Sequence, residues 1–335
     1  MLEKVIEIEW KAQDLQCRYN NSGPLIEQIT RIPPDIGTEE TRSFNYLIMQ
    51  GSFDPPTVSH LELLSKAIDL RSKSSPHEMS HLILLLSLSH VDKKLDVTKR
   101  SLLGHRVVML EKLFSEFDLG LPITIGLSNV ARYIELITAS EKSLNKSNNV
   151  TFIMGMDVFE KVLDPNYYSK PLEELIPLIF QTNYIVAGRK EVFSEKSFSS
   201  FLNKYLSAAF HVQVSFLLMP EHLRFRNATQ IRERFSKDLP SQEKDIHPII
   251  LQYLKENNLY HQSPEWLATK IAIQTITQLT LTANNDQILA QKILKVLLPE
   301  IQRNETLQQR LIDEYQTNKN VEISKKWNQI RKSIS

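Results

Sequence analysis

The sequence has 335 residues, of which 41% are hydrophobic and 24% are charged, so it can form a large hydrophobic core. Its 40 basic and 39 acidic residues give a formal net charge of +1, which excludes a strong overall attraction to nucleic acid or to an anionic membrane surface. The single cysteine, Cys17, excludes an internal disulfide bond and a cluster of thiolate ligands, and it suits a reducing compartment.

Residues 1–43 differ from the rest of the chain because turn-forming sequences interrupt them. These are NNSGP at positions 20–24 and a pair of prolines at positions 33 and 34. We expect an irregular amino-terminal extension that leads into the first core strand. The amino terminus also lacks the positive and then apolar regions of an export signal, so we expect a cytoplasmic protein.

Between residues 44 and 261, segments with strand character alternate with segments with helix character. Six aliphatic runs have the length of strands, at 47–49, 82–88, 123–126, 150–154, 184–187 and 212–218. Amphipathic helical patterns lie at 61–70, 102–117, 130–144 and 158–163. This alternation predicts an α/β fold with a mainly parallel sheet covered by helices on both faces. The most apolar run, 82–88, is far shorter than the roughly 20 residues of a membrane span, so no membrane contact is expected.

Three of the 8 glycines, Gly51, Gly155 and Gly188, each follow a predicted strand. Glycine allows the backbone to turn sharply or to approach another group closely. In an open parallel sheet, ligands bind outside the carboxyl ends of the strands. We therefore expect the ligand site at the edge of the sheet where these three glycines lie.

The last part of the chain, residues 262–335, has a different composition. It is rich in Gln, Leu, Ile, Asn and Lys and contains no glycine. We expect a helical carboxyl-terminal extension of two or three helices, interrupted near Asn284 and Pro299. Such an addition could support a homo-oligomer or a protein partner, and the sequence leaves both open.

The strongest motif is GSFDPPTVSH at residues 51–60, between the predicted strand that ends at Gln50 and a helix expected to begin near Leu61. The first N–H groups of a helix lack internal acceptors and the helix dipole favours an anion there, so this position suits a phosphate. The motif resembles GSFDPP(T/H)xGH of the nicotinamide and nicotinate mononucleotide adenylyltransferases. These belong to the nucleotidylyltransferase superfamily, whose shared signature is (T/H)xGH.

Further segments resemble motifs of that family in the same order along the chain. They are HVDKK at 90–94 followed by Arg106, GMD at 155–157, AGR at 187–189 and NATQIR at 227–232. The resemblance covers about residues 44–260 and implies a catalytic domain with a Rossmann-like parallel sheet. It also implies ATP and nicotinamide or nicotinate mononucleotide as substrates, which would be joined into a dinucleotide with release of pyrophosphate.

The resemblance assigns roles to individual residues. A mononucleotide phosphate oxygen would attack the α-phosphorus of ATP, so catalysis would consist of positioning and charge stabilisation. Catalytic roles are implied for His60, Thr57 and Arg232. Contacts to ATP are implied for Gly51, Ser52, Phe53, Ser59, Lys93, Arg106, Asn227 and Thr229. Contacts to the mononucleotide are implied for Asp54, Gly155, Asp157, Tyr167, Tyr168 and Arg189. Mg²⁺ is the expected cofactor, bound through the substrate phosphates without a metal site of the protein's own.

Two departures from the family motifs keep alternatives open. Ser59 stands where the family has glycine and is expected to crowd the backbone near the adenine, while Asn227 and Ala228 replace two serines. Transfer to another acceptor, such as phosphopantetheine or a phospho-alcohol in a cytidylyl transfer, is one alternative. A nucleotide-binding sensor or scaffold without turnover, whose carboxyl-terminal extension recruits a partner, is another. Separately, His60 could only cap or pack at the start of a helix. A metal site of the histidines at 77, 81, 90 and 105 is rejected because their spacing lacks the paired pattern of a helical zinc site.

Overall fold

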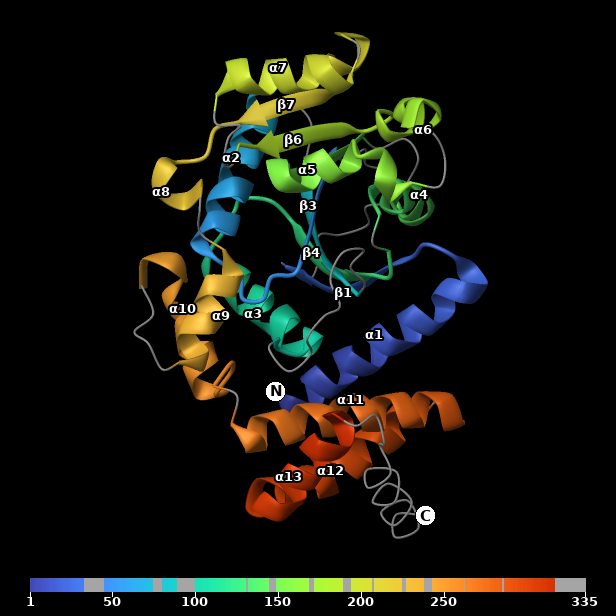
Figure 1. The fold of residues 1–335 in the computed structure, drawn as a ribbon, viewed down its shortest axis with the longest axis vertical. Coiled ribbons are helices and arrows are strands. Elements are labelled where there is room, and N and C mark those ends of the chain that lie inside the picture. The colour runs from blue at the N-terminus through green and yellow to red at the C-terminus, as the bar shows by residue number, and fades with distance from the viewer. Residues whose placement is uncertain are drawn as a thin grey trace.

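The computed structural model describes residues 1–32, 45–74, 80–88, 100–130, 132–144, 149–168, 172–188, 194–206, 208–224, 227–237, 243–261, 263–284 and 286–316. In this part of the chain seven strands form one sheet (Figure 1). They are β1 (Ile26–Ile32), β2 (Asn45–Gly51), β3 (Ser80–Ser87), β4 (Ile123–Ser128), β5 (Asn149–Gly155), β6 (Asn183–Ala187) and β7 (Val214–Leu217).

The described α-helices are α1 (Leu2–Ser22), α2 (Val58–Ser74), α3 (Leu103–Glu116), α4 (Tyr133–Ser143), α5 (Met156–Val162), α6 (Leu172–Ile179), α7 (Glu195–Tyr205), α8 (Glu221–Arg224), α9 (Ala228–Ser236), α10 (Pro248–Glu256), α11 (Pro264–Asn284), α12 (Gln287–Arg303) and α13 (Glu305–Gln316). Short 3-10 helices are η3 (Pro165–Tyr167), η4 (Ala208–Gln213) and η5 (Glu243–Asp245).

The strand order is β1-β4-β3-β2-β5-β6-β7, and every neighbouring pair is parallel except β1 with β4. Without β1, and counted along the chain from β2, this is the order 3-2-1-4-5-6 of the doubly wound Rossmann-like sheet. The prediction of an α/β fold with a mainly parallel sheet is therefore confirmed.

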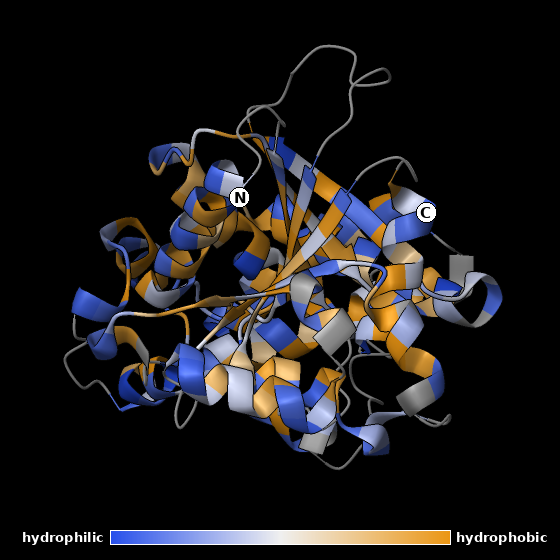
Figure 2. Cartoon of the chain, turned by 90° about the horizontal axis from the view of Figure 1, so that it is seen from above, coloured by the Kyte–Doolittle hydropathy of each residue, from blue (hydrophilic) through white to orange (hydrophobic). Residues whose placement is uncertain are grey.

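Two hydrophobic clusters cover the two faces of the sheet. In β3, Leu82, Leu84 and Leu86 join one cluster, whereas Ile83 and Leu85 join the other, because successive side chains of a strand point to opposite faces. Helices α2 and α3 pack on the first face, and α4, α5, α6 and α7 pack on the second. Viewed from above, the strands carry hydrophobic residues through the centre of the molecule (Figure 2).

The amino-terminal residues 1–32 are more regular than the sequence indicated. Helix α1 buries Val5, Ile8 and Leu15 on one face, at spacings typical of an amphipathic helix, and β1 adds an antiparallel edge strand beside β4. Helices α1 and α3 approach closely, since a Cβ atom at Gly104 would lie 2.5 Å from the Val5 carbonyl oxygen. The turn sequence NNSGP at 20–24 spans the end of α1, which stops at Ser22, and the prolines at 33 and 34 lie outside the described residues.

The carboxyl-terminal helices α11, α12 and α13 form a layer beside α1 (Figure 1). Helix α11 ends at Asn284, as expected. Pro299 was expected to interrupt the helices but lies inside α12, because the flanking Leu298 and Ile301 are buried in the core cluster and hold the helix together. No described helix has both the length and the apolar character needed to cross a membrane. The boundaries at residues 43 and 262 stay predictions.

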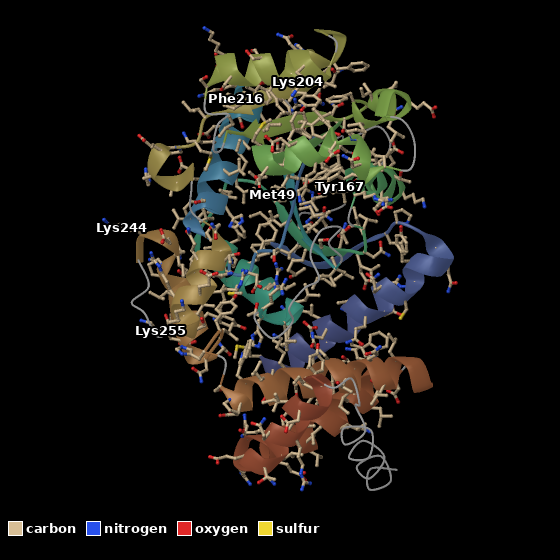
Figure 3. The ribbon with its side chains drawn as sticks, viewed as in Figure 1. Met49, Tyr167, Lys204, Phe216, Lys244 and Lys255 are labelled. Carbon is tan, nitrogen blue, oxygen red and sulfur yellow. The ribbon has the colours of Figure 1, made fainter. Side chains whose placement is uncertain are left out.

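The strand order reverses at the centre of the sheet, between β2 and β5. From β2 the chain continues to β3 and β4 on one side, and from β5 it continues to β6 and β7 on the other. The pairing of β2 with β5 runs only as far as Ile48 and Phe152, whereas the pairing of β2 with β3 continues to Gly51. Strands β2 and β5 therefore separate toward their carboxyl ends, and the helices that follow them, α2 and α5, cover opposite faces. Figure 3 shows Met49 of β2 in the middle of the molecule, just before this point. Open α/β sheets bind their ligands at this point, and we call the region between the carboxyl ends of β2 and β5 the crevice.

Candidate active site

The turn after β2 is held by the ring of Phe53. Phe53 has a positive φ of 45°, which is uncommon for a residue other than glycine, and its side chain is only 1% exposed. A Cβ atom at Gly51 would lie 3.1 Å from the Phe53 ring, so the lack of a side chain at Gly51 lets the ring fold back under the turn. The ring belongs to the core, so the predicted contact of Phe53 to ATP would come from its backbone, and it stays a prediction.

Thr57 and His60 cap helix α2 together. The Thr57 Oγ1 atom accepts from the His60 N–H at 3.4 Å, and the His60 Nδ1 atom accepts from the Thr57 N–H at 3.0 Å. This reciprocal pair has the geometry of a capping box in which histidine replaces the usual Glu or Gln. Because Nδ1 accepts a hydrogen bond, the proton of the neutral ring lies on Nε2, which makes that nitrogen a donor. Capping and a role as hydrogen-bond donor are therefore compatible in His60.

Ser59 is buried between α2 and α8. Its Oγ atom donates to the Leu223 carbonyl oxygen at 3.3 Å, and the residue is 3% exposed. The side chain that departs from the family glycine thus fills space beside α8 and links the start of α2 to the segment before α9.

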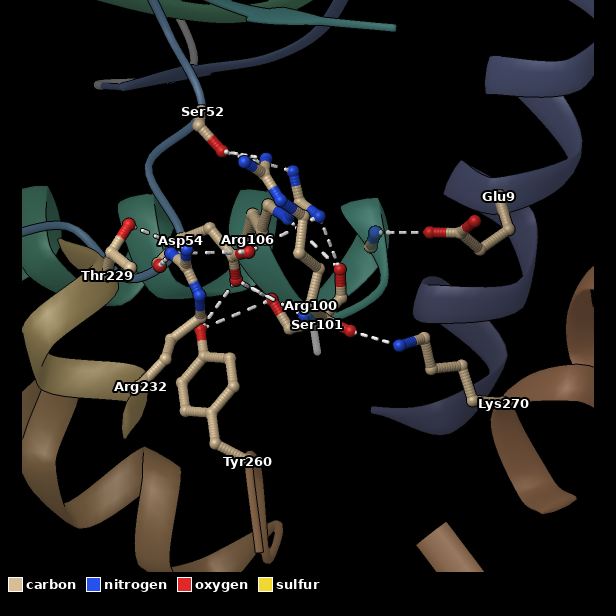
Figure 4. Close-up of polar contacts among 11 residues, drawn as sticks. Glu9, Ser52, Asp54, Arg100, Ser101, Arg106, Thr229, Arg232, Tyr260 and Lys270 are labelled. Carbon is tan, nitrogen blue, oxygen red and sulfur yellow. Dashed lines mark hydrogen bonds and ion pairs between the residues drawn. The ribbon is translucent and has the colours of Figure 1, made fainter. Parts of the chain in front are cut away.

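A buried carboxylate, Asp54, organises the cluster next to this helix (Figure 4). Its Oδ1 atom accepts from the Ser101 hydroxyl at 2.6 Å, from the Ser101 N–H at 3.2 Å and from the Tyr260 hydroxyl at 2.6 Å. Its Oδ2 atom forms ion pairs with Arg106 at 3.5 Å and with Arg232 at 3.8 Å. Asp54 is 0% exposed, so its partners in the structure are protein groups and not an open ligand surface. Its predicted contact to the mononucleotide stays a prediction.

Three guanidinium groups surround this carboxylate and the neighbouring turn. Ser52 Oγ accepts from Arg100 at 2.9 Å and from Arg106 at 3.4 Å. Arg106 also donates to the Ser101 carbonyl oxygen at 2.6 and 3.0 Å, and Arg232 donates to the Asp54 carbonyl oxygen at 2.5 Å. Among the described residues of this cluster three cations face one carboxylate, which gives them a positive excess beside the first turn of α2.

The electrostatics of the cluster favour an ionised Asp54. Burial by itself would raise the pKa of the Asp54 carboxyl, but Arg106, Arg232 and the hydroxyls of Ser101 and Tyr260 together lower that pKa below its usual value. Burial, followed by repulsion from Arg106, lowers the pKa of Arg100 from its ordinary value. Burial, followed by the Asp54 charge, raises the pKa of Tyr260 well above its ordinary value, so the phenol stays a hydrogen-bond donor.

Helix α9 brings the last predicted motif to the cluster. Asn227 is its N-cap, and its Oδ1 atom accepts from the Gln230 N–H at 3.0 Å. The Thr229 hydroxyl accepts from Arg232 at 3.0 Å, which orients the guanidinium toward Asp54. Asn227 thus replaces a serine of the family motif without loss of the cap, and its predicted contact to ATP stays a prediction.

The other side of the crevice follows β5. Gly155 precedes α5, and Asp157 lies in the first turn of that helix, where its charge, after burial, helps to raise the pKa of Tyr133. The Tyr168 hydroxyl donates to the Val162 carbonyl oxygen at 2.7 Å, and burial raises the pKa of Tyr168 to about 12. Figure 3 shows Tyr167 beside this part of the fold.

Tyr167 and Tyr168 therefore differ in their contacts. The Lys161 Nζ atom lies 5.7 Å from the centre of the Tyr167 ring, at the range of a cation–π contact. Tyr168 packs against the hydrophobic cluster of the second sheet face. Two further predicted residues, Lys93 and Arg189, lie outside the described residues.

The sequence analysis did not select Arg100, Ser101 and Tyr260. Ser101 precedes α3 in the sequence, and a polar residue at that point is a weak signal of a helix start. Tyr260 follows α10 and reaches Asp54 from 206 positions away, which no local pattern could indicate.

In the described part of the chain no group of three or more His, Cys, Asp or Glu side chains could hold a metal ion. Asp54 is already engaged by two arginines and two hydroxyls. A bound triphosphate would supply oxygen ligands, so Mg²⁺ carried by the substrate phosphates fits these described residues and stays a prediction.

Fold and site together define an α/β protein with a Rossmann-like sheet and a cationic cluster at the carboxyl end of β2, where the strand order reverses. The sequence matches no protein-family model, and no curated protein matches it. Among solved structures, a candidate nicotinate-nucleotide adenylyltransferase from Vibrio parahaemolyticus matches with 16% sequence identity and a TM-score of 0.36. The match covers 66% of this chain and 97% of that chain. A likeness of this size does not bear on substrate or activity.

Proposed function

We propose that this protein is a nucleotidyltransferase that joins ATP to nicotinamide or nicotinate mononucleotide and releases pyrophosphate. The observation that carries the proposal is the convergence of Arg100, Arg106 and Arg232 next to the capped start of α2. These cations lie at the carboxyl end of β2, where the strand order of the sheet reverses. The motif that resembles the adenylyltransferases lies at the same place.

The arginines suit the phosphates of ATP. Ser52 Oγ is a neutral acceptor that engages Arg100 and Arg106, and a charged phosphate oxygen is a stronger acceptor for the same donors. Since the arginines outnumber the Asp54 carboxylate, a bound triphosphate would neutralise the excess. Arg232 and Thr229 would then face the pyrophosphate that leaves.

His60 and Thr57 would act on the charge that develops in the reaction. A mononucleotide phosphate oxygen attacks the α-phosphorus, a new P–O bond forms, and the bond to pyrophosphate breaks. The attacking oxygen is already anionic near neutral pH, so the step needs no general base. The Nδ1 atom of His60 accepts from Thr57, so Nε2–H is the ring group that would donate to an oxygen that gains charge. When Mg²⁺ is bound through the phosphates, it shares the neutralisation of their charge.

The placement of Ser59 supports an enzyme over a sensor without turnover. The departure from glycine was expected to crowd the nucleotide, yet the Ser59 hydroxyl is directed to Leu223 and is buried. Tyr167 supports a planar acceptor, because its ring offers an aromatic face in the segment after α5, whereas Tyr168 packs against the hydrophobic cluster.

The test is pyrophosphate release by the purified full-length chain with ATP and MgCl₂. Parallel reactions contain nicotinamide mononucleotide, nicotinate mononucleotide, phosphopantetheine or no acceptor, and a further reaction contains CTP with a phospho-alcohol. We expect release that depends on one of the two pyridine mononucleotides. Release with another acceptor only would change the substrate class, and ATP binding without release from any mixture would favour the sensor.

A further inference from the structure

The segment that carries Arg100 and Arg106 is held from outside the α/β core by two buried ionisable side chains. On one side, Glu9 of α1 accepts from the Gly104 N–H at 2.9 Å and is 4% exposed (Figure 4). The N-cap residue of α3, Leu102, makes no side-chain cap hydrogen bond of its own. Glu9 of α1 therefore caps the start of α3, through an N–H group two residues before Arg106.

On the other side, Lys270 of α11 holds the start of the segment. Its Nζ atom donates to the Arg100 carbonyl oxygen, and the residue is 4% exposed. The same Nζ atom lies 4.4 Å from the centre of the Trp266 ring, which favours a cation at that point. Figure 4 shows Glu9 and Lys270 reaching this segment from different helices.

Both contacts cost solvation energy that core packing alone does not require. Burial raises the pKa of the Glu9 carboxyl, even though the Gly104 N–H, Arg106 and Lys270 favour its charged form. In some proteins a buried ionisable group is retained because it specifies a geometry, whereas apolar residues often stabilise a core equally well. The geometry specified here is that of the backbone from Arg100 to Gly104.

We propose that Glu9 and Lys270 are positioning residues that set the Arg100 and Arg106 guanidinium groups for phosphate binding. The amino-terminal helix α1 and the carboxyl-terminal layer thereby take part in substrate binding. This inference rests on the proposed function, since it assumes that the two arginines bind the phosphates of ATP. It assigns a task to two regions that the family motifs do not reach.

The experiment measures the dissociation constants of inorganic pyrophosphate and of adenosine for the full-length protein by calorimetry. Lys270→Met removes the donor and keeps most of the side chain's packing. We expect it to weaken pyrophosphate binding about tenfold and to leave adenosine binding unchanged. The reason is that a small displacement of the Arg100 and Arg106 guanidinium groups would affect contacts to phosphate and not to the nucleoside. Lys295→Met, at an exposed position of α12, is the matched control and should leave both constants unchanged.

Conservative variants separate positioning from general stability. Glu9→Gln keeps an oxygen that can accept from the Gly104 N–H, so it should bind pyrophosphate within about twofold of the natural protein, whereas Glu9→Ala should lose about tenfold. Lys270→Arg keeps a donor, and a cavity of about 260 Å³ beside Lys270, His105 and Trp266 offers room for the larger group. Thermal unfolding of each variant shows which of them are folded.

The outcomes are distinct. If the natural protein does not bind pyrophosphate, the proposed function fails and this inference fails with it. If it binds pyrophosphate and folded Lys270→Met and Glu9→Ala bind it equally well, only the inference is wrong. An equal loss of adenosine and pyrophosphate affinity would also overturn it, since that pattern indicates general disruption. If Lys270→Met does not fold, the comparison of Glu9→Ala with Glu9→Gln decides.

Discussion

The two sides of the crevice between β2 and β5 hold their side chains in different ways. Around Asp54, contacts join segments far apart in the sequence, with Tyr260 206 positions away and Arg232 178 positions away. Around Tyr168, the described hydrogen bond is local and reaches Val162 six positions away. The side around Asp54, which we propose binds phosphate, is thus fixed by the tertiary structure, while the side around Tyr168, which we propose binds the acceptor, depends on a short segment. Recognition of phosphate should be rigid, and the choice of acceptor should be easier to change.

The largest expected effect tests the phosphate side. His60→Ala should lower turnover about a hundredfold or more, because a donor to the developing charge is lost. Loss of the cap should also destabilise the fold by about 1 kcal/mol. His60→Gln is the control, since glutamine at this position can complete a capping box and retain the stability. Full pyrophosphate release by a folded alanine variant would show that the catalytic centre lies elsewhere.

A pH profile of stability tests the helix that carries Arg106, because the preceding residue, His105, is bonded to Tyr253 of α10. Burial, and then the charge of Lys270, lowers the pKa of His105 to about 4 from an ordinary value of 6.5. The unfolded chain therefore takes up this proton first as the pH falls. The stability that His105 contributes is fully present above pH 6.5 and is lost as the pH falls toward 4.

This loss is expected to reach about 2 kcal/mol or more between pH 7 and pH 4.5. Urea unfolding of the natural protein and of His105→Gln at both pH values measures the difference between them. Glutamine has no charge to gain, so its variant should lose less stability over the same range. Equal losses in the two proteins would contradict the depressed pKa.

Arg100→Met sharpens the comparison between substrates. It removes one of the two guanidinium groups at Ser52, so the KM for ATP should rise about tenfold while the KM for the mononucleotide changes less than about twofold. Arg303→Met, at an exposed position of α12, is the matched control. Equal rises in both KM values would break the division of the crevice into two sides.

The smallest expected effect falls on the acceptor side. Tyr167→Ala should raise the KM for the mononucleotide about threefold and leave the KM for ATP unchanged, since one aromatic contact is lost. Tyr168→Phe should leave both KM values unchanged and destabilise the fold by about 1 kcal/mol, because its hydroxyl bonds to Val162. A larger effect of Tyr168→Phe on the mononucleotide would reverse the assignment of the two rings.

Much of the fold could be predicted because the signals are local. The run 82–88 has strand length and became β3, and its alternate residues serve the two faces of the sheet. Helix α1 was missed although Val5, Ile8 and Leu15 follow a helical spacing, because turn sequences nearby suggested irregular structure. Strand β1 was missed because an edge strand is specified by its partner β4, about 100 residues later in the chain.

The candidate site divides in the same way. Thr57 and His60 lie three residues apart on one helical turn, so their pairing follows from the motif and the helix that begins there. Arg100, Ser101 and Tyr260 were not predicted, because they meet Asp54 only after three separate segments pack together. The burial of Asp54 could not be predicted either, since a carboxylate becomes stable inside a core only when its partners arrive.

The sequence by itself determined the alternation of strands and helices, the position of the phosphate motif after β2, and the local cap that orients His60. These depend on residues within a few positions of one another, where backbone geometry alone sets the contacts. The tertiary structure decided the strand order, the buried cluster around Asp54, and the contacts that Glu9 and Lys270 make with the segment from Arg100 to Gly104. These join distant segments, and their free energy arises only when packing excludes water from all partners at once.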